Sequence, residues 1–199
     1  MNKKNLRKQK MFERDSLSEE MLQALSDVIT EKVIGLDEYK NAESVLCFVS
    51  CRSEVKTDKL ISHAIKSGKI VGVPKVEGND IFFYRIDSLD ELEPGYFGVL
   101  EPNVFQKRHD GLSDADKIKP IDPEGSLIIV PGLVFDRSLN RIGYGKGFYD
   151  RYFSTNKDKY FVKCGISFEI QLCERIAIDV HDQPLDILVT EKETLRKAK

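Results

Sequence analysis

The chain has 199 residues, of which 41% are hydrophobic and 32% charged, and its formal net charge at pH 7 is -2. This length and apolar content suit a single domain over residues 1–199, and the near-neutral charge gives no reason to expect nucleic acid as the main partner. No apolar run approaches the length of a membrane span, so we expect no membrane partner.

Two helices are expected at the start of the chain. Residues 3–15 are basic and fit a helix, although a helical face that is simply solvated would show the same charges. The segment 16–19 reads Ser-Leu-Ser-Glu and fits the S-x-x-E capping pattern, with Ser18 as a second possible cap. The helix that follows should bury an apolar face formed by Leu22, Leu25, Ile29 and Val33.

A strand–helix–strand unit comes next. Residues 44–50 form an apolar strand, Thr57 can cap the following helix, and residues 70–74 form a second strand. About thirty residues separate the two strands, which predicts parallel pairing with a helical crossover. Residues 81–86 should add a third strand.

The second half of the chain continues this alternation after a turn-rich section. A polar surface loop is expected over residues 103–125, with His109 solvated. The remaining expected elements are strands at 126–130, 160–167 and 187–190, a helix starting at 148–153, and a charged C-terminal tail. Together these elements predict an α/β fold: a single-domain three-layer sandwich whose mostly parallel, Rossmann-like sheet is flanked by helices and carries its site at the carboxyl ends of the strands.

The cysteines and the N-terminus indicate the compartment. Cys47 and Cys164 lie in strand-like runs and are expected to be buried thiols, and the four cysteines show no zinc-ligand spacing. The basic first residues are not followed by the apolar segment of a secretory signal. We therefore expect a reduced, cytoplasmic protein, and we expect it to be a monomer.

The most informative stretch is glycine-rich and follows the 126–130 strand. Gly143, Gly145 and Gly147 alternate with Tyr144 and Lys146. Alternating glycines let the backbone approach a ligand closely, and free amides beside a helix start bind anions. With the positive charge of Lys146, the loop could bind a polyphosphate. Its spacing is neither Walker A nor G-x-G-x-x-G, and an ordinary glycine-rich turn with a solvated lysine is the alternative.

Three acids could serve the same edge of the sheet. Glu54 lies just past the first strand, where it could accept hydrogen bonds from a heterocycle, or equally sit near a helix start as a surface carboxylate. Asp150, just after the glycines, could hold a divalent cation, and Asp182 could join it. For Asp182 a capped turn is an equally ordinary role.

The motif residues resemble those of a known family. Residues 131–136, PGLVFD, and 141–151, RIGYGKGFYDR, are similar to the signature of the 5-formyltetrahydrofolate cyclo-ligases, also called 5,10-methenyltetrahydrofolate synthetases. The resemblance covers nearly the whole chain. It extends to Lys3, Leu6, Arg7, Glu54, Val55, Thr57, Gly68, Lys69, Pro74, Gly98, Glu101, Pro102, Gln171, His181, Asp182, Leu185 and Asp186.

The resemblance implies a reaction: 5-formyltetrahydrofolate and ATP give 5,10-methenyltetrahydrofolate, ADP and phosphate. Transfer of the γ-phosphoryl group to the formyl oxygen activates the carbon. The neighbouring folate nitrogen then closes the ring, and phosphate leaves. Catalysis of this kind is largely positioning and charge stabilisation.

The resemblance also implies roles for residues. Lys146 and Arg7 would act in catalysis, and Mg²⁺ would be bound by Asp150 and Asp182. The folate substrate would contact Arg7, Val49, Glu54 and Phe148. ATP would contact Lys3, Arg7, Arg141, Ile142, Gly143, Tyr144, Gly145, Lys146, Gly147, Phe148 and Tyr149.

The sequence departs from the family pattern at two positions. Leu139 stands where the family usually has glycine, which affects the geometry of the turn before Arg141. Phe148 stands where a tyrosine is usual, so that a hydroxyl is lost while the aromatic face is kept.

Two other kinds of function remain open. A sugar-phosphate isomerase or CoA-transferase-like enzyme of similar architecture would need no ATP, and the Lys146–Asp150 pair argues against it. A folate-binding protein would store 5-formyltetrahydrofolate without turnover. Formation of the methenyl chromophore, with ADP release that depends on the folate, separates these from a cyclo-ligase.

Overall fold

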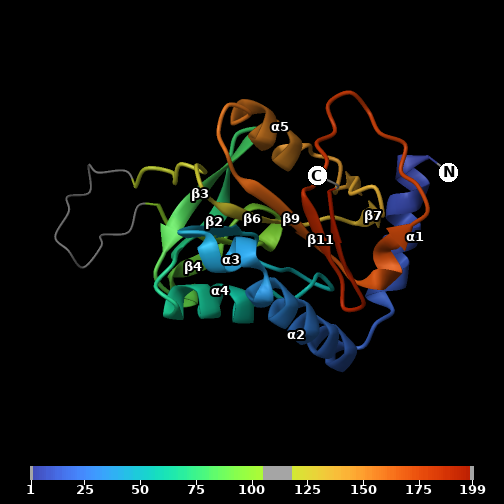
Figure 1. Ribbon diagram of the computed structural model, residues 1–199, viewed down its shortest axis with the longest axis horizontal. Coiled ribbons are helices and arrows are strands. Elements are labelled where there is room, and N and C mark those ends of the chain that lie inside the picture. Colours follow the sequence, from blue (N-terminus) through green and yellow to red (C-terminus); the bar gives the residue numbers. More distant parts are fainter. Residues whose placement is uncertain (1, 105–117, 198–199) are drawn as a thin grey trace.

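The computed structural model describes residues 2–104 and 118–197. Its centre is a seven-stranded sheet with the strand order β12-β11-β9-β6-β1-β2-β3 (Figure 1). The pairs within β11-β9-β6-β1-β2 are parallel, and only the two edge strands β12 and β3 run antiparallel to their neighbours. The strands are β1 (Ser44–Cys47), β2 (Ile70–Glu77), β3 (Asp80–Ile86), β6 (Leu127–Val130), β9 (Val162–Ile166), β11 (Ile187–Val189) and β12 (Thr194–Arg196).

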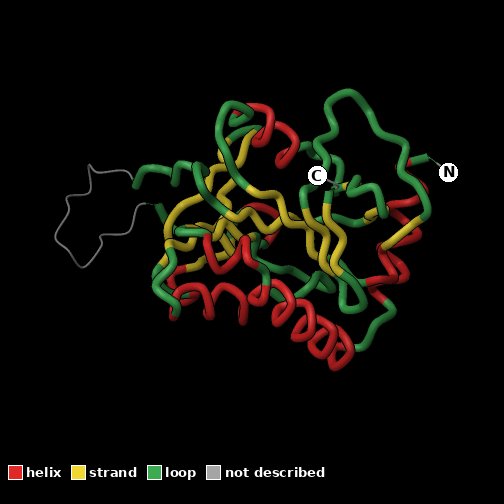
Figure 2. Tube along the Cα trace, viewed as in Figure 1, coloured by secondary structure: helices red, strands yellow, loops and turns green. Residues whose placement is uncertain are grey.

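Helices cover both faces of this sheet. Figures 1 and 2 show α2, α3 and α4 on one face, α5 on the other, and α1 along the end of the sheet nearest β11. The helices are α1 (Lys3–Asp15), α2 (Glu19–Gly35), α3 (Asp37–Asn41), α4 (Asp58–Lys66) and α5 (Phe148–Thr155). The predicted three-layer α/β fold with a mostly parallel, Rossmann-like sheet is confirmed. The single-domain boundary, 1–199, stays a prediction.

Short elements complete the structure. One small sheet has the order β10-β7-β8, and one ribbon pairs β4 with β5. These strands are β4 (Leu92–Pro94), β5 (Leu100–Pro102), β7 (Val134–Asp136), β8 (Arg141–Ile142) and β10 (Leu172–Cys173), and the 3-10 helices are η1 (Leu89–Glu91), η2 (Tyr96–Gly98) and η3 (Glu169–Gln171).

The alternation of the central strands divides the core between the two helical layers. Val45 and Ile129 belong to the cluster that packs under α2 and α4, whereas Leu46 and Ile128 belong to the cluster that includes residues of α5. Successive side chains of a strand point to opposite faces, so a strand covered on both faces must be apolar throughout. All four of these residues are 0% exposed. Complete burial of each side chain contributes about 1.5–3 kcal/mol to the stability of the fold.

Several expected boundaries were wrong. The first strand ends at Cys47 rather than residue 50. The strand expected over residues 160–167 is β9 and begins at Val162, and the charged C-terminal tail contains β12. Ser18, not Ser16, caps α2 by accepting a hydrogen bond from the N–H of Met21. The loop expected around His109 lies mostly outside the described residues.

Thr57 precedes α4 but does not cap it with its side chain. Its hydroxyl instead donates to the carbonyl of Phe48 (2.9 Å) and accepts from the N–H of Ser50 (3.0 Å). This side chain is fully buried. Thr57 therefore fixes the loop that follows β1, in which Glu54 lies.

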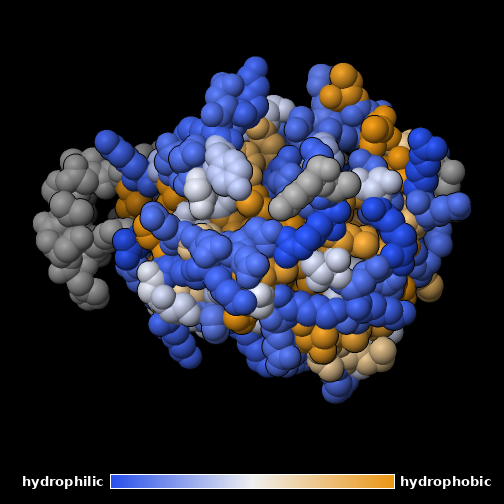
Figure 3. Space-filling view, in the orientation of Figure 1, coloured by the Kyte–Doolittle hydropathy of each residue, from blue (hydrophilic) through white to orange (hydrophobic). Residues whose placement is uncertain are grey.

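The cysteine thiols and the surface can be compared with what the sequence predicts. Cys47 and Cys164 are buried free thiols, as expected. Across the part of the chain that the structure describes, none of the helices has the length and apolar character needed to cross a membrane. The face in Figure 3 is mostly hydrophilic, with exposed apolar residues in separated areas.

Candidate active site

The strands β1 and β6 are neighbours at the centre of the sheet, and the chain leaves them in opposite directions. After β1 it continues through α4 to β2, and after β6 it continues through α5 to β9 on the other side. Such a switch point opens a crevice at the carboxyl ends of the strands. A narrow cleft lies there, lined by Arg14, Phe48, Glu54, Val55, Pro131, Gly132, Ile166 and Gln171.

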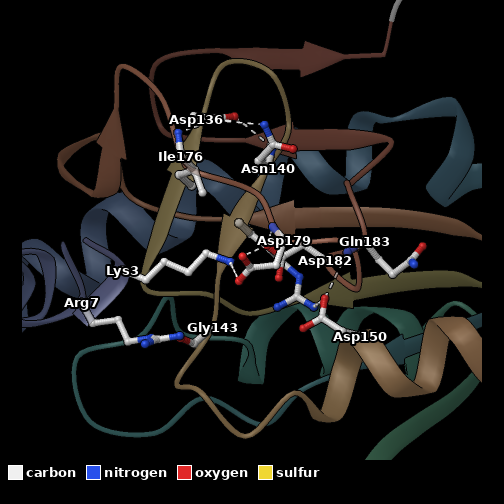
Figure 4. Close-up of polar contacts among 11 residues, drawn as sticks. Lys3, Arg7, Asp136, Asn140, Gly143, Asp150, Ile176, Asp179, Asp182 and Gln183 are labelled. Atoms are coloured by element: carbon white, nitrogen blue, oxygen red, sulfur yellow. Dashed lines mark hydrogen bonds and ion pairs between the residues drawn. The ribbon is translucent and has the colours of Figure 1, made fainter. Parts of the chain in front are cut away.

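The motif residue Asp136 builds the turn that leads into the glycine loop. Its carboxylate is fully buried and accepts hydrogen bonds from the N–H groups of Ser138, Asn140 and Ile176 and from the Asn140 side chain, at 2.9–3.1 Å (Figure 4). Four donors replace the water that the buried charge loses. The hairpin of β7 and β8 therefore presents the next residues in one fixed direction.

The glycine loop joins β8 to α5 and is held from two sides. The Nε–H of Arg7 on α1 donates to the carbonyl of Gly143 at 2.8 Å, and Arg151 donates to the carbonyl of Lys146 at 2.8 Å. Gly145 and Gly147 have φ of 98° and 68°, a region that glycine adopts without steric cost. The loop ends in the first turn of α5, with the Lys146 side chain exposed. Backbone amides beside a helix start suit anions, and phosphate binding by this loop stays a prediction.

Arg141 is buried and paired with Asp150. Its guanidinium donates to Asp150 Oδ1 at 2.8 Å, and the rings of Tyr149 and Phe153 lie 5.7 and 5.9 Å from its central carbon. Burial lowers the pKa of Arg141, while the charge of Asp150 acts in the opposite direction. In this structure Arg141 holds an acid in place, so its expected contact with ATP stays a prediction.

Asp182 lies close to the same arginine and is paired with Lys3 of α1. The Lys3 ammonium contacts Asp179 at 2.6 Å and Asp182 at 2.5 Å, and the N–H of Asp179 donates to Asp182 at 2.7 Å. Burial alone would raise the pKa of Asp182, but the Asp179 N–H, Lys3 and Arg141 lower it. The N–H of Gln183 also donates to Asp150 at 3.3 Å, which joins the two acidic loops (Figure 4).

These two carboxylates fit the donor set of a magnesium site that is completed by phosphate oxygens. Both lie beside Arg141, and the contacts above use only Oδ1 of Asp150 and Oδ2 of Asp182. Magnesium commonly takes one or two carboxylates together with substrate phosphates. Among the residues described, there is no cluster of three or more acids, histidines or cysteines that could bind a metal without such a substrate.

Glu54 lies in the cleft and contacts the glycine loop. Only 6% of the residue is exposed, its Oε2 accepts from the N–H of Cys51 (3.0 Å), and its Oε1 accepts from the hydroxyl of Tyr144 (2.6 Å). The reading of Glu54 as a surface carboxylate is therefore wrong. Val49, five residues before Glu54, is buried. Phe148 packs edge-on against Tyr96, with ring centroids 6.3 Å apart. The expected folate and ATP positions thus meet at the pair of Glu54 and Tyr144.

Arg14 was not among the residues expected at the site, but it is 2% exposed and lines the cleft. A signal was present. Lys3, Arg7, Lys10 and Arg14 are spaced at i, i+4, i+7 and i+11, which places all four on one face of a helix. Each of them donates a hydrogen bond to a residue outside α1.

Comparison with known proteins assigns the chain. Residues 1–191 match the sequence model described as the 5-formyltetrahydrofolate cyclo-ligase family. The chain belongs to this family. The resemblance seen in the glycine-rich motif is thereby confirmed.

Related proteins cover most of the chain. A probable 5-formyltetrahydrofolate cyclo-ligase of Schizosaccharomyces pombe is 32% identical over 90% of both chains, and the 5-formyltetrahydrofolate cyclo-ligase of Mus musculus is 31% identical over 88% of this chain and 86% of its own. A solved structure of Aquifex aeolicus 5,10-methenyltetrahydrofolate synthetase is 35% identical. It has a TM-score of 0.80 and covers 98% of this chain and 93% of its own.

A larger cavity, of about 410 Å³, lies between β3, α5 and residues 119–123. Its lining includes neither the glycine loop nor Glu54, Asp150 or Asp182. We place the candidate site at the β1–β6 switch point because the charged groups converge there, although the larger hollow is elsewhere.

Proposed function

We propose that the protein catalyses the ATP-dependent conversion of 5-formyltetrahydrofolate to 5,10-methenyltetrahydrofolate, with release of ADP and phosphate. Membership of the cyclo-ligase family supports the reaction. The observation that carries it in this chain is the contact between Tyr144 of the glycine loop and Glu54 of the cleft, because it brings a phosphate-binding loop and a heterocycle-binding acid together.

The chemistry requires an activated formamide. The formyl oxygen of the substrate attacks the γ-phosphorus of ATP, and ADP leaves. The neighbouring folate nitrogen then adds to the formyl carbon and loses its proton, and the oxygen departs as phosphate. The protein has to hold the two substrates in line and stabilise the charge of the phosphoryl group in transfer.

Each part of the site has a role in this scheme. The amides of residues 143–147 hold the phosphates, and Lys146 stabilises the phosphoryl group as it moves. Arg7 and Lys3 add positive charge from α1, while Glu54 accepts hydrogen bonds from the pterin ring. Val49 and Phe148 form the apolar lining of the folate site.

Asp150 and Asp182 would hold Mg²⁺, which neutralises charge on the phosphates of the nucleotide. Arg141 keeps Asp150 oriented for this role. Lys3 is paired with Asp182 at 2.5 Å. With Mg²⁺ held by Asp150 and Asp182, Lys3 would be available to contact the phosphates.

One assay tests the proposal. Purified protein is mixed with 5-formyltetrahydrofolate, ATP and Mg²⁺, and the methenyl chromophore and ADP are followed together. Equal amounts of both products are expected, and none when ATP is omitted. Methenyl formation without ATP would favour an enzyme of another class, and folate binding by calorimetry without either product would favour a storage protein. The expected monomeric state and cytoplasmic location stay predictions.

A further inference from the structure

A continuous set of hydrogen bonds runs from α1 to Glu54. The Nη2–H of Arg14 donates to the hydroxyl oxygen of Tyr144 at 3.1 Å, and that hydroxyl donates onward to Glu54 Oε1 at 2.6 Å. The Nε–H of Arg14 donates to Ser53 Oγ at 3.0 Å, and Ser53 donates to Asp15. Arg14 thus acts on two carboxylates through two neutral hydroxyl groups.

The burial of these groups makes the arrangement costly to disturb. Arg14 and Glu54 are only 2% and 6% exposed, and a buried charge requires both a counter-charge and hydrogen bonds. Tyr144 as a whole is 48% exposed, but desolvation of its hydroxyl and the charge of Glu54 raise its pKa, so this hydroxyl stays protonated and can donate. Without Arg14, the Tyr144 hydroxyl would have one partner fewer and Glu54 would lose the positive charge behind it.

The glycine loop does not depend on Arg14 for its backbone position. Gly143 is held by Arg7 and the carbonyl of Lys146 by Arg151, and neither contact involves Arg14. Removal of Arg14 should therefore disturb the Glu54 carboxylate more than the amides of the glycine loop, which are proposed to bind the phosphates.

We propose that Arg14 is a positioning residue for the folate substrate: it orients the hydroxyl of Tyr144 and, through it, the carboxylate of Glu54. This inference rests on the proposed function, in which Glu54 binds the pterin ring. It gives a role to a residue outside the glycine motif and outside the expected contacts with ATP.

The test compares Arg14→Met and Arg14→Lys with the wild type. Loss of a hydrogen bond to a charged group weakens binding by about one to two decades, so Arg14→Met should raise the KM for 5-formyltetrahydrofolate at least tenfold and the KM for ATP much less. Lysine keeps the charge but not the two-sided geometry of the guanidinium, so Arg14→Lys should show a smaller increase, of about two- to tenfold. Lys8→Met, on the exposed face of α1, is the matched control and should leave both KM values unchanged.

Two further measurements separate positioning from a general loss of structure. Calorimetric titrations of each ligand alone should show the same preference for folate as the kinetics. In a double-mutant cycle, Arg14→Met and Tyr144→Phe should be clearly non-additive for folate binding, because the first acts through the second. Equal effects on folate and ATP, or additive effects in the cycle, would overturn the proposal.

The same variants distinguish a failure of the role proposed for Arg14 from a failure of the proposed reaction. If the wild type forms no methenyl product, the proposed function fails. If it does form product and Arg14→Met keeps the wild-type KM for folate, only the role of Arg14 fails. If Arg14→Met does not fold, an unchanged folate KM in folded Arg14→Lys overturns the proposal, and an increase confined to folate supports it.

Discussion

Leu139 combines a left-handed backbone conformation, with φ of 68°, and a buried side chain that is 5% exposed. A left-handed leucine costs about 1–2 kcal/mol, whereas loss of a buried leucine side chain costs about 2–5 kcal/mol. Burial therefore dominates, and Leu139→Gly should lower the free energy of unfolding by roughly 1–3 kcal/mol in urea titrations. Leu139→Ala keeps the strain and retains only Cβ of the buried side chain, so it should be the less stable of the two variants. The reverse order would contradict the strain argument.

Lys146 is the residue whose loss should affect chemistry most and folding least. Its side chain is exposed in a loop that other residues hold in place. Loss of one charge-stabilising donor costs about 3–4 kcal/mol in the transition state, so Lys146→Met should lower the turnover number about 10²- to 10³-fold. The melting temperature should not change, and Lys157→Met, an exposed lysine beyond α5, should leave both quantities at wild-type values. A wild-type turnover number in Lys146→Met would remove the role assigned to this lysine.

At the scale of the element, α1 supplies a row of cations to the site. Residues 3–15 were expected to be a basic helix, and the repeat of charges was visible, but solvation of that face was the simpler interpretation. A sequence shows the spacing of charges on a helix but not what faces them, because the opposing groups come from Ser53 and from residues 143–182. The structure shows that face turned inward, whereas Lys4 and Lys8 are exposed.

Arg7 tests whether α1 acts on the nucleotide. Because its guanidinium holds the Gly143 carbonyl, Arg7→Ala should release one end of the loop and raise the KM for ATP, with a smaller effect on the melting temperature. A hydrogen bond from a charged group contributes about 1.5–3 kcal/mol, so an increase of roughly tenfold is expected, and more if Arg7 also contacts phosphate. Lys8→Ala, on the exposed face of the same helix, serves as the control. Wild-type kinetics in Arg7→Ala would support the alternative interpretation, in which the basic face of α1 is simply solvated.

The edge strand β12 provides a prediction about pH. Arg196 donates to Glu38 of α3, and this hydrogen bond lowers the pKa of Glu38 below its usual value of 4.5. A lowered pKa in the folded state stabilises the protein above that usual value, and the contribution is lost as the pH falls through the folded-state pKa. Arg196 is half exposed, so Glu38→Gln should cost no more than about 1 kcal/mol at pH 7. In urea titrations the difference from the wild type should shrink as the pH is lowered below 4.5, and exposed Glu31→Gln should show no difference at either pH.

At the scale of the whole molecule, the layered sheet could be predicted because each central strand is apolar throughout and each crossover helix has one apolar face. β12 could not, because Thr194–Arg196 contains a single apolar residue and pairs only as an edge strand. The hairpin of β7 and β8 was hidden inside the motif, where its strands are two or three residues long. The contacts of Lys3 with Asp182 and of Tyr144 with Glu54 join distant segments, so no local pattern reveals them.

The metal site depends on this long-range assembly, since Asp150 lies in the first turn of α5 and Asp182 comes from a loop near the end of the chain. If both acids serve one Mg²⁺ ion, Asp150→Asn and Asp182→Asn should each raise the magnesium concentration needed for half-maximal turnover. Their effects should be non-additive, because the second loss acts on a site that is already broken. Asp150 is also the partner of buried Arg141, so Asp150→Asn should in addition lower the melting temperature.

Asp179 supplies the matched control, because it contacts the same lysine as Asp182 but is far more exposed, at 74% against 26% of the side chain. Asp179→Asn should therefore keep a normal magnesium requirement, and melts of all ligand-free variants separate stability from metal dependence. If Asp182→Asn instead behaves like Asp179→Asn, Asp182 serves only to hold Lys3 and the turn. The metal would then be left with Asp150 and the phosphates of ATP, a set that magnesium also accepts.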